Sequence, residues 1–287
     1  MEPLYVRAYA KVNLTLEVLG RRPDGFHRIA TVLQTVGLWD DLFLFPLPHG
    51  VEVECSEASL SGEANLVFRA ARLLRGEEGV GQGARIVVCK GIPVASGLGG
   101  GSSDAAAALR GLARLWGLPL SHERLAGLAA RLGSDVPFFL RGGTALAQGR
   151  GEEITPLPPL GETWFVLLSP PLGGEGKTAR LYSLLPPDRW TDGSPTARLV
   201  DALRKGEPLH DGLLFNAFEA VAFEAFPGLP EYWRGLEEAA GSTPHLTGTG
   251  PSLFTLAPSP ARAQEIALAL RRRGWRAWAV PPIRPAE

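Results

Sequence analysis

Four glycines within five positions mark one short segment as the first candidate for chemistry. Glycine permits positive φ and lets the backbone approach a ligand closely. At the start of a helix, unpaired backbone N–H groups and the helix dipole together favour an anion. The segment PVASGLGGGSSDAAAAL (93–109) therefore predicts a phosphate-binding loop that leads into a helix, and its serine hydroxyls could contact phosphate or magnesium. The residues concerned are Gly97, Gly99, Gly100, Gly101, Ser102 and Ser103.

Two familiar nucleotide-binding motifs do not account for this segment. The dinucleotide fingerprint G-x-G-x-x-G follows the first strand of its fold, whereas this loop lies beyond residue 90 and after a proline. The Walker A motif requires G-x-x-x-x-G-K-[ST], and the loop has no lysine. GGEGKT (173–178) resembles Walker A, but its first glycine position holds Pro171. GGEGKT is therefore interpreted as a loop with a chance resemblance.

Three polar residues elsewhere could take part in acid–base chemistry. Lys11 lies within the strand-like VRAYAKVNLTLEVLG (6–20), where an inward ammonium group would be unusual. Asn13 shares its face, because side chains alternate along a strand. Asp135 follows an expected helix end in LGSDVPFF. From these residues alone, the ordinary interpretations are an exposed lysine, a structural asparagine and an aspartate that caps a turn.

Apolar periodicity predicts the elements that must position these groups. Strands are expected at 6–20, 28–38, 41–47, 51–55, 84–94, 142–154, 163–171, 252–258 and 275–280. Helices are expected at 65–76, 104–116, 121–133, 199–206, 216–226, 232–241 and 260–274. Near 150–162, glycine, proline and glutamate replace periodic apolar sequence. We therefore expect one unit over 1–155 and a second over 156–287.

The overall composition is that of a globular protein with no bias toward nucleic acid. Hydrophobic residues make up 45% and charged residues 21%, and the net charge is −1. A nucleic-acid partner would usually require a basic face. The N-terminus has no signal-like apolar core, and no apolar run reaches the roughly 18 residues of a membrane helix. Cys55 and Cys89 match no zinc or redox spacing and are expected to be buried in a reduced compartment. A cytoplasmic protein without a membrane partner is expected.

Set beside its flanks, the glycine loop resembles one of three motifs of a small-molecule kinase family. This is the galactokinase, homoserine kinase, mevalonate kinase and phosphomevalonate kinase (GHMP) superfamily. The motifs occur in order as AYAKVNLTLEV, PVASGLGGGSS and LTGTGPSLF, and they span residues 8–254. AKVNLTLEVLGRRPDGFH, GLGGGSSDAAAAL and LGSDVPFFL resemble more closely the kinases that act on 4-diphosphocytidyl-2-C-methylerythritol.

The resemblance implies a two-domain α/β (α+β) fold. Its N-terminal domain is similar to domain 2 of ribosomal protein S5, a GHMP C-terminal domain follows, and the active site lies in the cleft between them. It also implies transfer of phosphate from ATP to the 2-hydroxyl of the cytidyl substrate, giving the 2-phosphate and ADP. In that chemistry Asp135 is the general base, and Lys11 keeps the aspartate ionised. Asn13 is expected to orient the hydroxyl or the aspartate.

The same resemblance assigns the remaining site residues. Phe26 and Tyr182 would enclose the cytosine ring, His27 would bond its edge, and Thr178 would contact the cytidyl side. The nucleotide would contact Pro93, Gly97, Leu98, Gly99, Gly100, Gly101, Ser102, Ser103, Asn65 and Lys90. Gly248, Thr249 and Gly250 would line the cleft. Magnesium would bridge the phosphates and contact Ser102 or Ser103, and Ser103 is the expected metal residue. A monomer or weak homodimer is expected.

Three alternatives remain, and each has a distinguishing feature. A homoserine- or mevalonate-type kinase would have no use for a cytosine clamp at DGFH (24–27). A non-catalytic relative would be expected to lose Asp135 or Lys11, and both are present. A P-loop ATPase based on GGEGKT lacks the first glycine.

Overall fold

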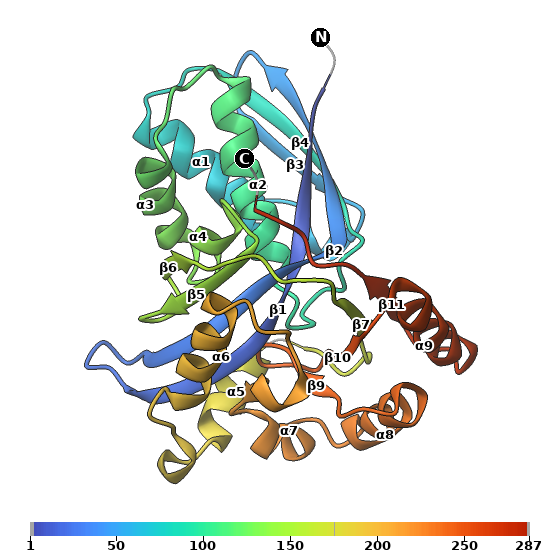
Figure 1. The fold of residues 1–287 in the computed structure, drawn as a ribbon. Coiled ribbons are helices and arrows are strands. Elements are labelled where there is room, and N and C mark those ends of the chain that lie inside the picture. The colour runs from blue at the N-terminus through green and yellow to red at the C-terminus, as the bar shows by residue number, and fades with distance from the viewer. Residues whose placement is uncertain (1–2, 175, 286–287) are drawn as a thin grey trace.

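The computed structural model describes residues 3–174 and 176–285, and Figure 1 shows their arrangement. One large sheet and one small sheet organise the chain. The large sheet has the order β3-β4-β2-β1-β8, with β5 paired to β2 and β6 to β5. Its strands are β1 (Leu4–Arg21), β2 (His27–Leu47), β3 (Val51–Cys55), β4 (Gly83–Cys89), β5 (Thr144–Gln148), β6 (Glu153–Pro156) and β8 (Phe215–Asn216).

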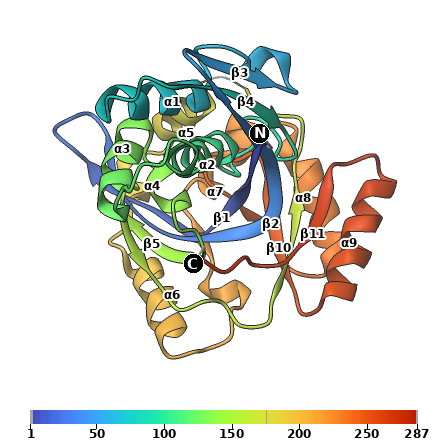
Figure 2. The same cartoon turned by 90° about the horizontal axis from the view of Figure 1, so that it is seen from above.

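Helices of the N-terminal half cover one face of the large sheet (Figures 1 and 2). The alanines 105–108 of α2 are at most 1% exposed, so this helix packs closely on β1 and β2. Asn65 caps α1, and Ser121 caps α3. These helices are α1 (Leu66–Glu77), α2 (Gly100–Leu115), α3 (His122–Leu132) and the short α4 (Val136–Phe139).

The C-terminal half is built on a small antiparallel sheet with the order β11-β7-β10-β9. Its strands are β7 (Trp164–Leu168), β9 (His245–Leu246), β10 (Leu253–Ala257) and β11 (Ala277–Val280). Its helices are α5 (Lys177–Leu184), α6 (Ser194–Arg204), α7 (Glu219–Ala225), α8 (Leu229–Ala240) and α9 (Pro260–Arg272). Short 3₁₀ turns occur at 58–60, 187–189 and 211–213.

The two halves are interlocked. Val12 and Leu14 of β1 share a buried cluster with Phe165 and Leu167 of β7. The two-residue strand β8 pairs in parallel with β1, so the second half completes the first sheet. The last described residues also return to β2, where the Ile283 N–H donates to the Thr35 carbonyl at 2.8 Å. The boundary at 155/156 stays a prediction.

Several local predictions from the sequence were wrong. The single strand expected at 142–154 forms two strands, because β5 ends at Gln148 and β6 begins at Glu153. The strands expected at 28–38 and 41–47 form the single strand β2, because Asp40 points inward instead of turning the chain. Its buried carboxylate accepts the backbone N–H groups of Gly91 and Ile92 at 2.6 and 2.8 Å. The cysteines are not both buried, since Cys89 is exposed and Cys55 is partly exposed.

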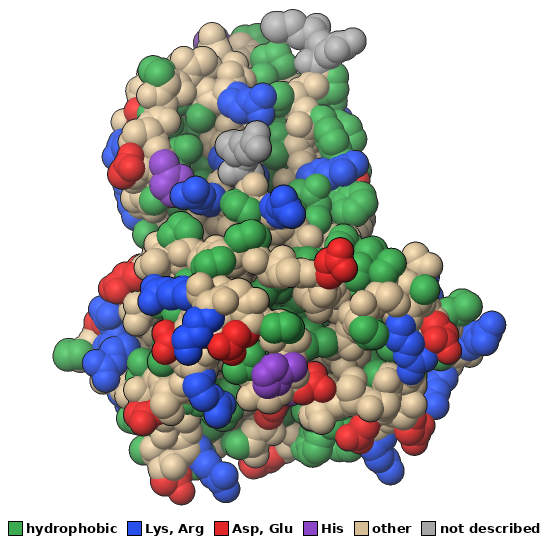
Figure 3. Space-filling view, viewed as in Figure 1, with side chains coloured by type: hydrophobic (Ala, Val, Ile, Leu, Met, Phe, Trp, Pro, Cys, Tyr) green, Lys and Arg blue, Asp and Glu red, His purple; other side chains and the backbone are tan. Residues whose placement is uncertain are grey.

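Charged side chains of both signs are spread over the surface that Figure 3 shows. On the face drawn in Figure 3, basic and acidic side chains are interspersed over the lower half of the molecule. Among residues 3–174 and 176–285, no helix is both long and apolar enough to cross a bilayer.

Candidate active site

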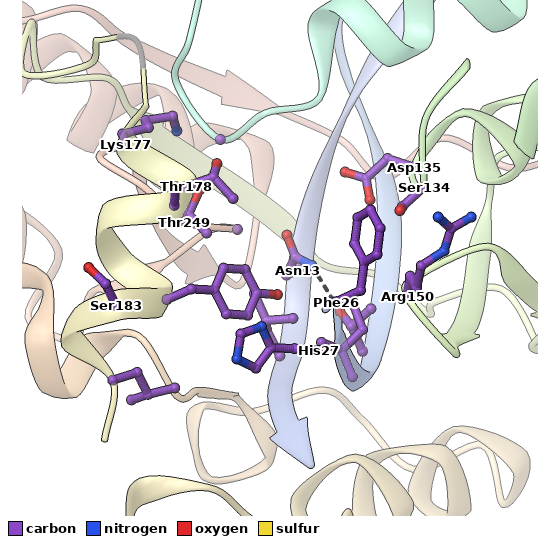
Figure 4. A pocket seen from close by; sticks show the side chains of 18 of the residues that line it. Asn13, Phe26, His27, Ser134, Asp135, Arg150, Lys177, Thr178, Ser183 and Thr249 are labelled. Atoms are coloured by element: carbon purple, nitrogen blue, oxygen red, sulfur yellow. Dashed lines mark hydrogen bonds between the residues drawn. The ribbon is translucent and has the colours of Figure 1, made fainter. Parts of the chain in front are cut away.

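One large cavity lies where the two halves meet, with a volume of about 1150 Å³. Figure 4 shows its walls, with α5 on one side of β1 and Asp135 on the other. Many of the predicted residues are brought together here. Those that line it are Lys11, Asn13, Phe26, His27, Gly97, Gly99, Asp135, Thr178, Tyr182, Gly248 and Thr249.

Lys11, Asn13 and Asp135 form a polar cluster in this cavity. The Lys11 Nζ donates to Asn13 Oδ1 at 2.6 Å and lies 3.7 Å from Asp135 Oδ2. Lys11 is only 3% exposed, and this burial lowers its pKa, while the charge of Asp135 acts in the opposite direction. Asn13 is fixed in turn, since its Nδ2 donates to Thr31 Oγ1 at 2.8 Å. The cluster pairs a held ammonium group with a carboxylate.

The Asp135 carboxylate is not used for helix capping. Asp135 is the residue before α4, yet its side chain makes no cap hydrogen bond. The side chain is 39% exposed, whereas the Lys11 side chain is 4% exposed. The carboxylate is therefore available to a molecule in the cavity.

The glycine loop is held close to this cluster. Gly97 and Gly99 have φ of +92° and +77°, a backbone region that residues other than glycine rarely adopt. A Cβ at Gly97 would lie 2.5 Å from the Thr247 carbonyl oxygen, and one at Gly99 would lie 3.1 Å from Lys11 Cγ. The Lys11 N–H donates to the Leu98 carbonyl at 2.9 Å. The glycine loop is thus packed against β1 immediately before α2 begins.

The glycine turn of the third motif lies between the polar cluster and α5. A Cβ at Gly248 would lie 3.2 Å from Lys11 Nζ, which places this turn directly over the ammonium group. Thr249 Oγ1 lies 3.0 Å from Thr178 Oγ1 on α5. The turn therefore joins the polar cluster to the helix that carries Tyr182.

Aromatic side chains gather at the other end of the cavity. His27 is stacked on Tyr182, with ring centroids 4.4 Å apart and an interplanar angle of 21°. Burial lowers the pKa of His27 and raises that of Tyr182 to about 12. Phe26 is 51% exposed, and the Arg150 guanidinium lies 4.8 Å from its ring centroid. An open ring face is thus available for a flat ligand.

Other predicted residues lie outside this cavity. Asn65 caps α1 by accepting from Val67 N at 2.8 Å, and its amide donates to Leu60 O at 2.7 Å. Pro93 and Leu98 are buried, and Ser103 is 2% exposed, whereas Ser102 is partly exposed. The predicted residues that do not line the cavity are Asn65, Lys90, Pro93, Leu98, Gly100, Gly101, Ser102, Ser103 and Gly250.

Lys90 is buried beneath the glycine loop. Its Nζ lies 2.5 Å from Asp40 Oδ2 and 2.7 Å from Asp104 Oδ2. Burial raises the pKa of Asp104 to about 7, against the opposing effect of Lys90. A Cβ at Gly100 would lie 3.2 Å from the Lys90 amine, so this ion triad supports the first turn of α2.

Sequence reasoning missed three cations in the cavity wall, Arg21, Arg150 and Lys177. Arg150 follows β5 and faces Phe26. Lys177 belongs to GGEGKT, which was interpreted as a loop, but α5 begins at this lysine, and Gly176 before it has a φ of +71°. The glycine–lysine–threonine spacing was a visible signal, and the absent first glycine led to its dismissal.

Comparison with known proteins identifies the family. Residues 65–143 match the N-terminal domain of the GHMP kinases, and residues 199–276 match their C-terminal domain. A Dehalococcoides mccartyi protein named 4-diphosphocytidyl-2-C-methyl-D-erythritol kinase is 43% identical over 286 residues, covering 99% of this chain and 100% of that protein. A Pelotomaculum thermopropionicum protein of the same name is 43% identical over 271 residues, covering 92% and 93%.

A solved structure extends this agreement to the fold. The crystal structure of a 4-(cytidine 5'-diphospho)-2C-methyl-D-erythritol kinase is similar with a TM-score of 0.82 at 37% identity, covering 96% of this chain and 98% of the other. The predicted two-domain α/β architecture is therefore confirmed. The chain belongs to the GHMP kinase family, in the group whose similar members are named 4-diphosphocytidyl-2-C-methyl-D-erythritol kinases.

Proposed function

We propose that the protein transfers the γ-phosphoryl group of ATP to the 2-hydroxyl of 4-diphosphocytidyl-2-C-methyl-D-erythritol, in the non-mevalonate route to isoprenoid precursors. The products are the 2-phosphate and ADP. One observation carries the proposal: the paired Lys11 and Asp135 lie against the glycine loop in one cavity, with Lys11 Cγ 3.1 Å from a Cβ position at Gly99. The names of the similar relatives support the choice of substrate.

Asp135 would act as the general base. As the substrate hydroxyl oxygen forms its bond to the γ-phosphorus, the hydroxyl proton passes to an Asp135 carboxylate oxygen. The bond from the γ-phosphorus to the bridging oxygen breaks, and ADP leaves with that electron pair. Lys11 would keep the carboxylate ionised and stabilise charge on the attacking oxygen. Asn13 holds the Lys11 ammonium in place.

The glycine loop would bind the phosphates through backbone N–H groups at the start of α2. Magnesium would be held mainly by the phosphates, with a serine hydroxyl at the start of α2 as its protein contact. It would neutralise charge on the β- and γ-phosphates. Of the two serines, Ser102 is more open to it than Ser103, whose residue is 2% exposed.

The aromatic end of the cavity would hold the cytidine. Phe26 offers an open ring face for the base, while Tyr182, stacked on His27, and Thr178 line the α5 side of this end. Among the described residues, the cavity wall carries Lys11, Arg21, Arg150 and Lys177 and one carboxylate, that of Asp135, a balance that suits a ligand with a diphosphate. Asn65 and Lys90 would shape the nucleotide site, since their polar atoms already have partners.

The protein is proposed to work in the cytoplasm as a monomer or a weak homodimer. Small-molecule phosphates are the proposed ligands, and neither nucleic acid nor membrane enters the proposal.

A substrate panel tests this function directly. The protein is given Mg-ATP with the cytidyl substrate, mevalonate or homoserine, and ADP release is followed. Only the cytidyl substrate is expected to support turnover, and NMR of the product should find the new phosphate on the 2-oxygen. Turnover with mevalonate or homoserine in preference, or with none of the three, would contradict the proposed substrate.

A further inference from the structure

Lys177, the lysine of GGEGKT, lies in the cavity at the first residue of α5. Its partly buried amine donates to the Gly250 carbonyl oxygen. The segment before it also packs on the glycine loop, since a Cβ at Gly173 would lie 2.6 Å from the Ala95 carbonyl oxygen. The amine is therefore held by the third motif beside the start of the loop.

The same carbonyl links Lys177 to the loop itself. A Cβ at Gly97 would lie 3.1 Å from the Gly250 oxygen that accepts from Lys177. Lys11 contacts the loop two residues further along, at Gly99. Two lysines from the two halves of the protein thus lie near the loop, Lys177 at the Gly97 side and Lys11 at Gly99. Figure 4 shows Lys177 across the cavity from Asp135.

The charged side chains among the described residues that line the cavity are mostly positive. The charged and titratable side chains that line the cavity are Lys11, Arg21, His27, Asp135, Arg150, Lys177 and Tyr182. Among the described residues that line the cavity, Asp135 is the only carboxylate, and it lies 3.7 Å from Lys11. Burial and the charge of Lys11 lower the pKa of Lys177 to about 7. An anion between the two lysines would offset the cost of burying the Lys177 ammonium group and its repulsion from Lys11.

We propose that Lys177 binds the γ-phosphoryl group of the nucleotide from the side opposite Lys11. The ammonium group would contact the non-bridging oxygens, where charge is spread during transfer, and would form or break no covalent bond itself. This role rests on the proposed kinase function. It gives the lysine of GGEGKT the task of a P-loop lysine, although it belongs to a different helix from the phosphate loop.

The position of Lys177 separates this role from binding of the substrate diphosphate. Lys177 lies at the Gly97 end of the cavity, against the turn that ends in Gly250. Arg150 lies against Phe26, in the aromatic part of the cavity proposed for cytidine. The guanidinium is therefore the cation placed for the cytidyl diphosphate, and the ammonium is the cation placed for the nucleotide.

Binding of three ligands to Lys177→Met tests the proposal. The ligands are the magnesium complex of β,γ-imido-ATP, ADP and CDP, measured by calorimetry. The imido-ATP affinity is expected to fall about 10- to 100-fold, the range of one charge-assisted hydrogen bond, while ADP and CDP affinities change less than about twofold. Lys205→Met is the matched control, because Lys205 is exposed at the end of α6. Lys177→Arg should retain part of the preference for the triphosphate.

Each other outcome overturns the proposal. Equal losses for imido-ATP and ADP would show that the lysine does not recognise the γ-phosphoryl group. A selective loss of CDP would assign it to the cytidyl substrate, and unchanged affinities would remove it from the site. If Lys177→Met does not fold, Lys177→Arg and Lys177→Gln take its place in the same comparison. The ligands contain no methylerythritol, so this result is independent of the substrate proposed above.

Discussion

Lys11 Nζ and Asp135 Oδ2 lie 3.7 Å apart, although 124 positions separate the two residues in the sequence. The lysine is almost fully buried, and the aspartate is open to the cavity. The arrangement places a buried ammonium group beside a carboxylate that a ligand in the cavity can still reach. The relationship gives the first prediction.

Asp135→Asn should lower kcat by about 10²- to 10⁴-fold, because the amide cannot accept the hydroxyl proton. The affinity for ATP should change little, since phosphates are proposed to bind at the glycine loop. Steady-state kinetics and calorimetry with ATP measure the two effects. Asp201→Asn on the exposed side of α6 serves as the control. A variant that keeps near wild-type turnover would remove Asp135 from the mechanism.

Gly97→Ala should weaken ATP binding and reduce turnover. Its φ of +92° and the Thr247 carbonyl oxygen 2.5 Å from the new Cβ both disfavour a side chain. Gly206→Ala separates the two causes, because Gly206 has φ +73° and open space around it. Both variants should lose about 1–2 kcal/mol of stability from the backbone conformation, and Gly97→Ala should lose more. Equal losses in unfolding free energy, with normal ATP binding, would contradict the close packing.

Phe26→Ala should raise KM for the cytidyl substrate by about tenfold or more, because stacking on a base contributes about 1–3 kcal/mol. The KM for ATP and kcat at saturation should stay near wild type. Phe223→Ala is the matched control, as Phe223 is 45% exposed and Phe26 is 51% exposed. An equal effect of both substitutions would argue against a cytosine contact.

Lys90→Met should destabilise the protein by about 3–5 kcal/mol, because it leaves Asp40 and Asp104 as buried carboxylates without their cation. Chemical denaturation measures this loss against Lys205→Met. If Lys90 acted on the nucleotide alone, the variant would weaken ATP binding while its unfolding free energy stayed normal.

The pH dependence of stability should differ between the wild type and Lys177→Met. The pKa of Lys177 is lowered to about 7 from 10.5, so between these values the unfolded chain binds a proton that the folded chain does not. The wild type should therefore gain stability as pH rises from about 7 towards 10.5. Lys177→Met lacks this gain, so its stability relative to wild type should be greatest below pH 7. Parallel curves from denaturation at pH 6 and pH 9 would contradict the lowered pKa.

Much of the fold could be predicted because local patterns determine it. The Asn65 and Ser121 caps and the alanine run of α2 lie where the sequence places them. The glycine spacing predicted a loop before α2, and Gly97 and Gly99 indeed have positive φ. Phosphate binding by that loop stays a prediction, as do the roles of the other site residues.

Long-range packing was harder to predict. Nothing near Asp40 reveals that its carboxylate accepts from Gly91 and Ile92 and pairs with Lys90, so the sequence suggested a break where β2 continues. The position of Lys177 could not be predicted from neighbouring residues either. Its position depends on the Gly250 carbonyl, 73 positions away, which no motif of neighbouring residues contains.

The return of the chain to β2 also has a consequence for folding during synthesis. Gly37 donates to the Pro281 carbonyl, and Thr35 accepts from Ile283, so the first sheet is completed by some of the last described residues. The ribosome must therefore have released the chain at least as far as residue 283 before these bonds form. Until then, the backbone groups of Thr35 and Gly37 on β2 have no partner from 281–283. An added peptide with the sequence of 281–283 is expected to compete for these groups.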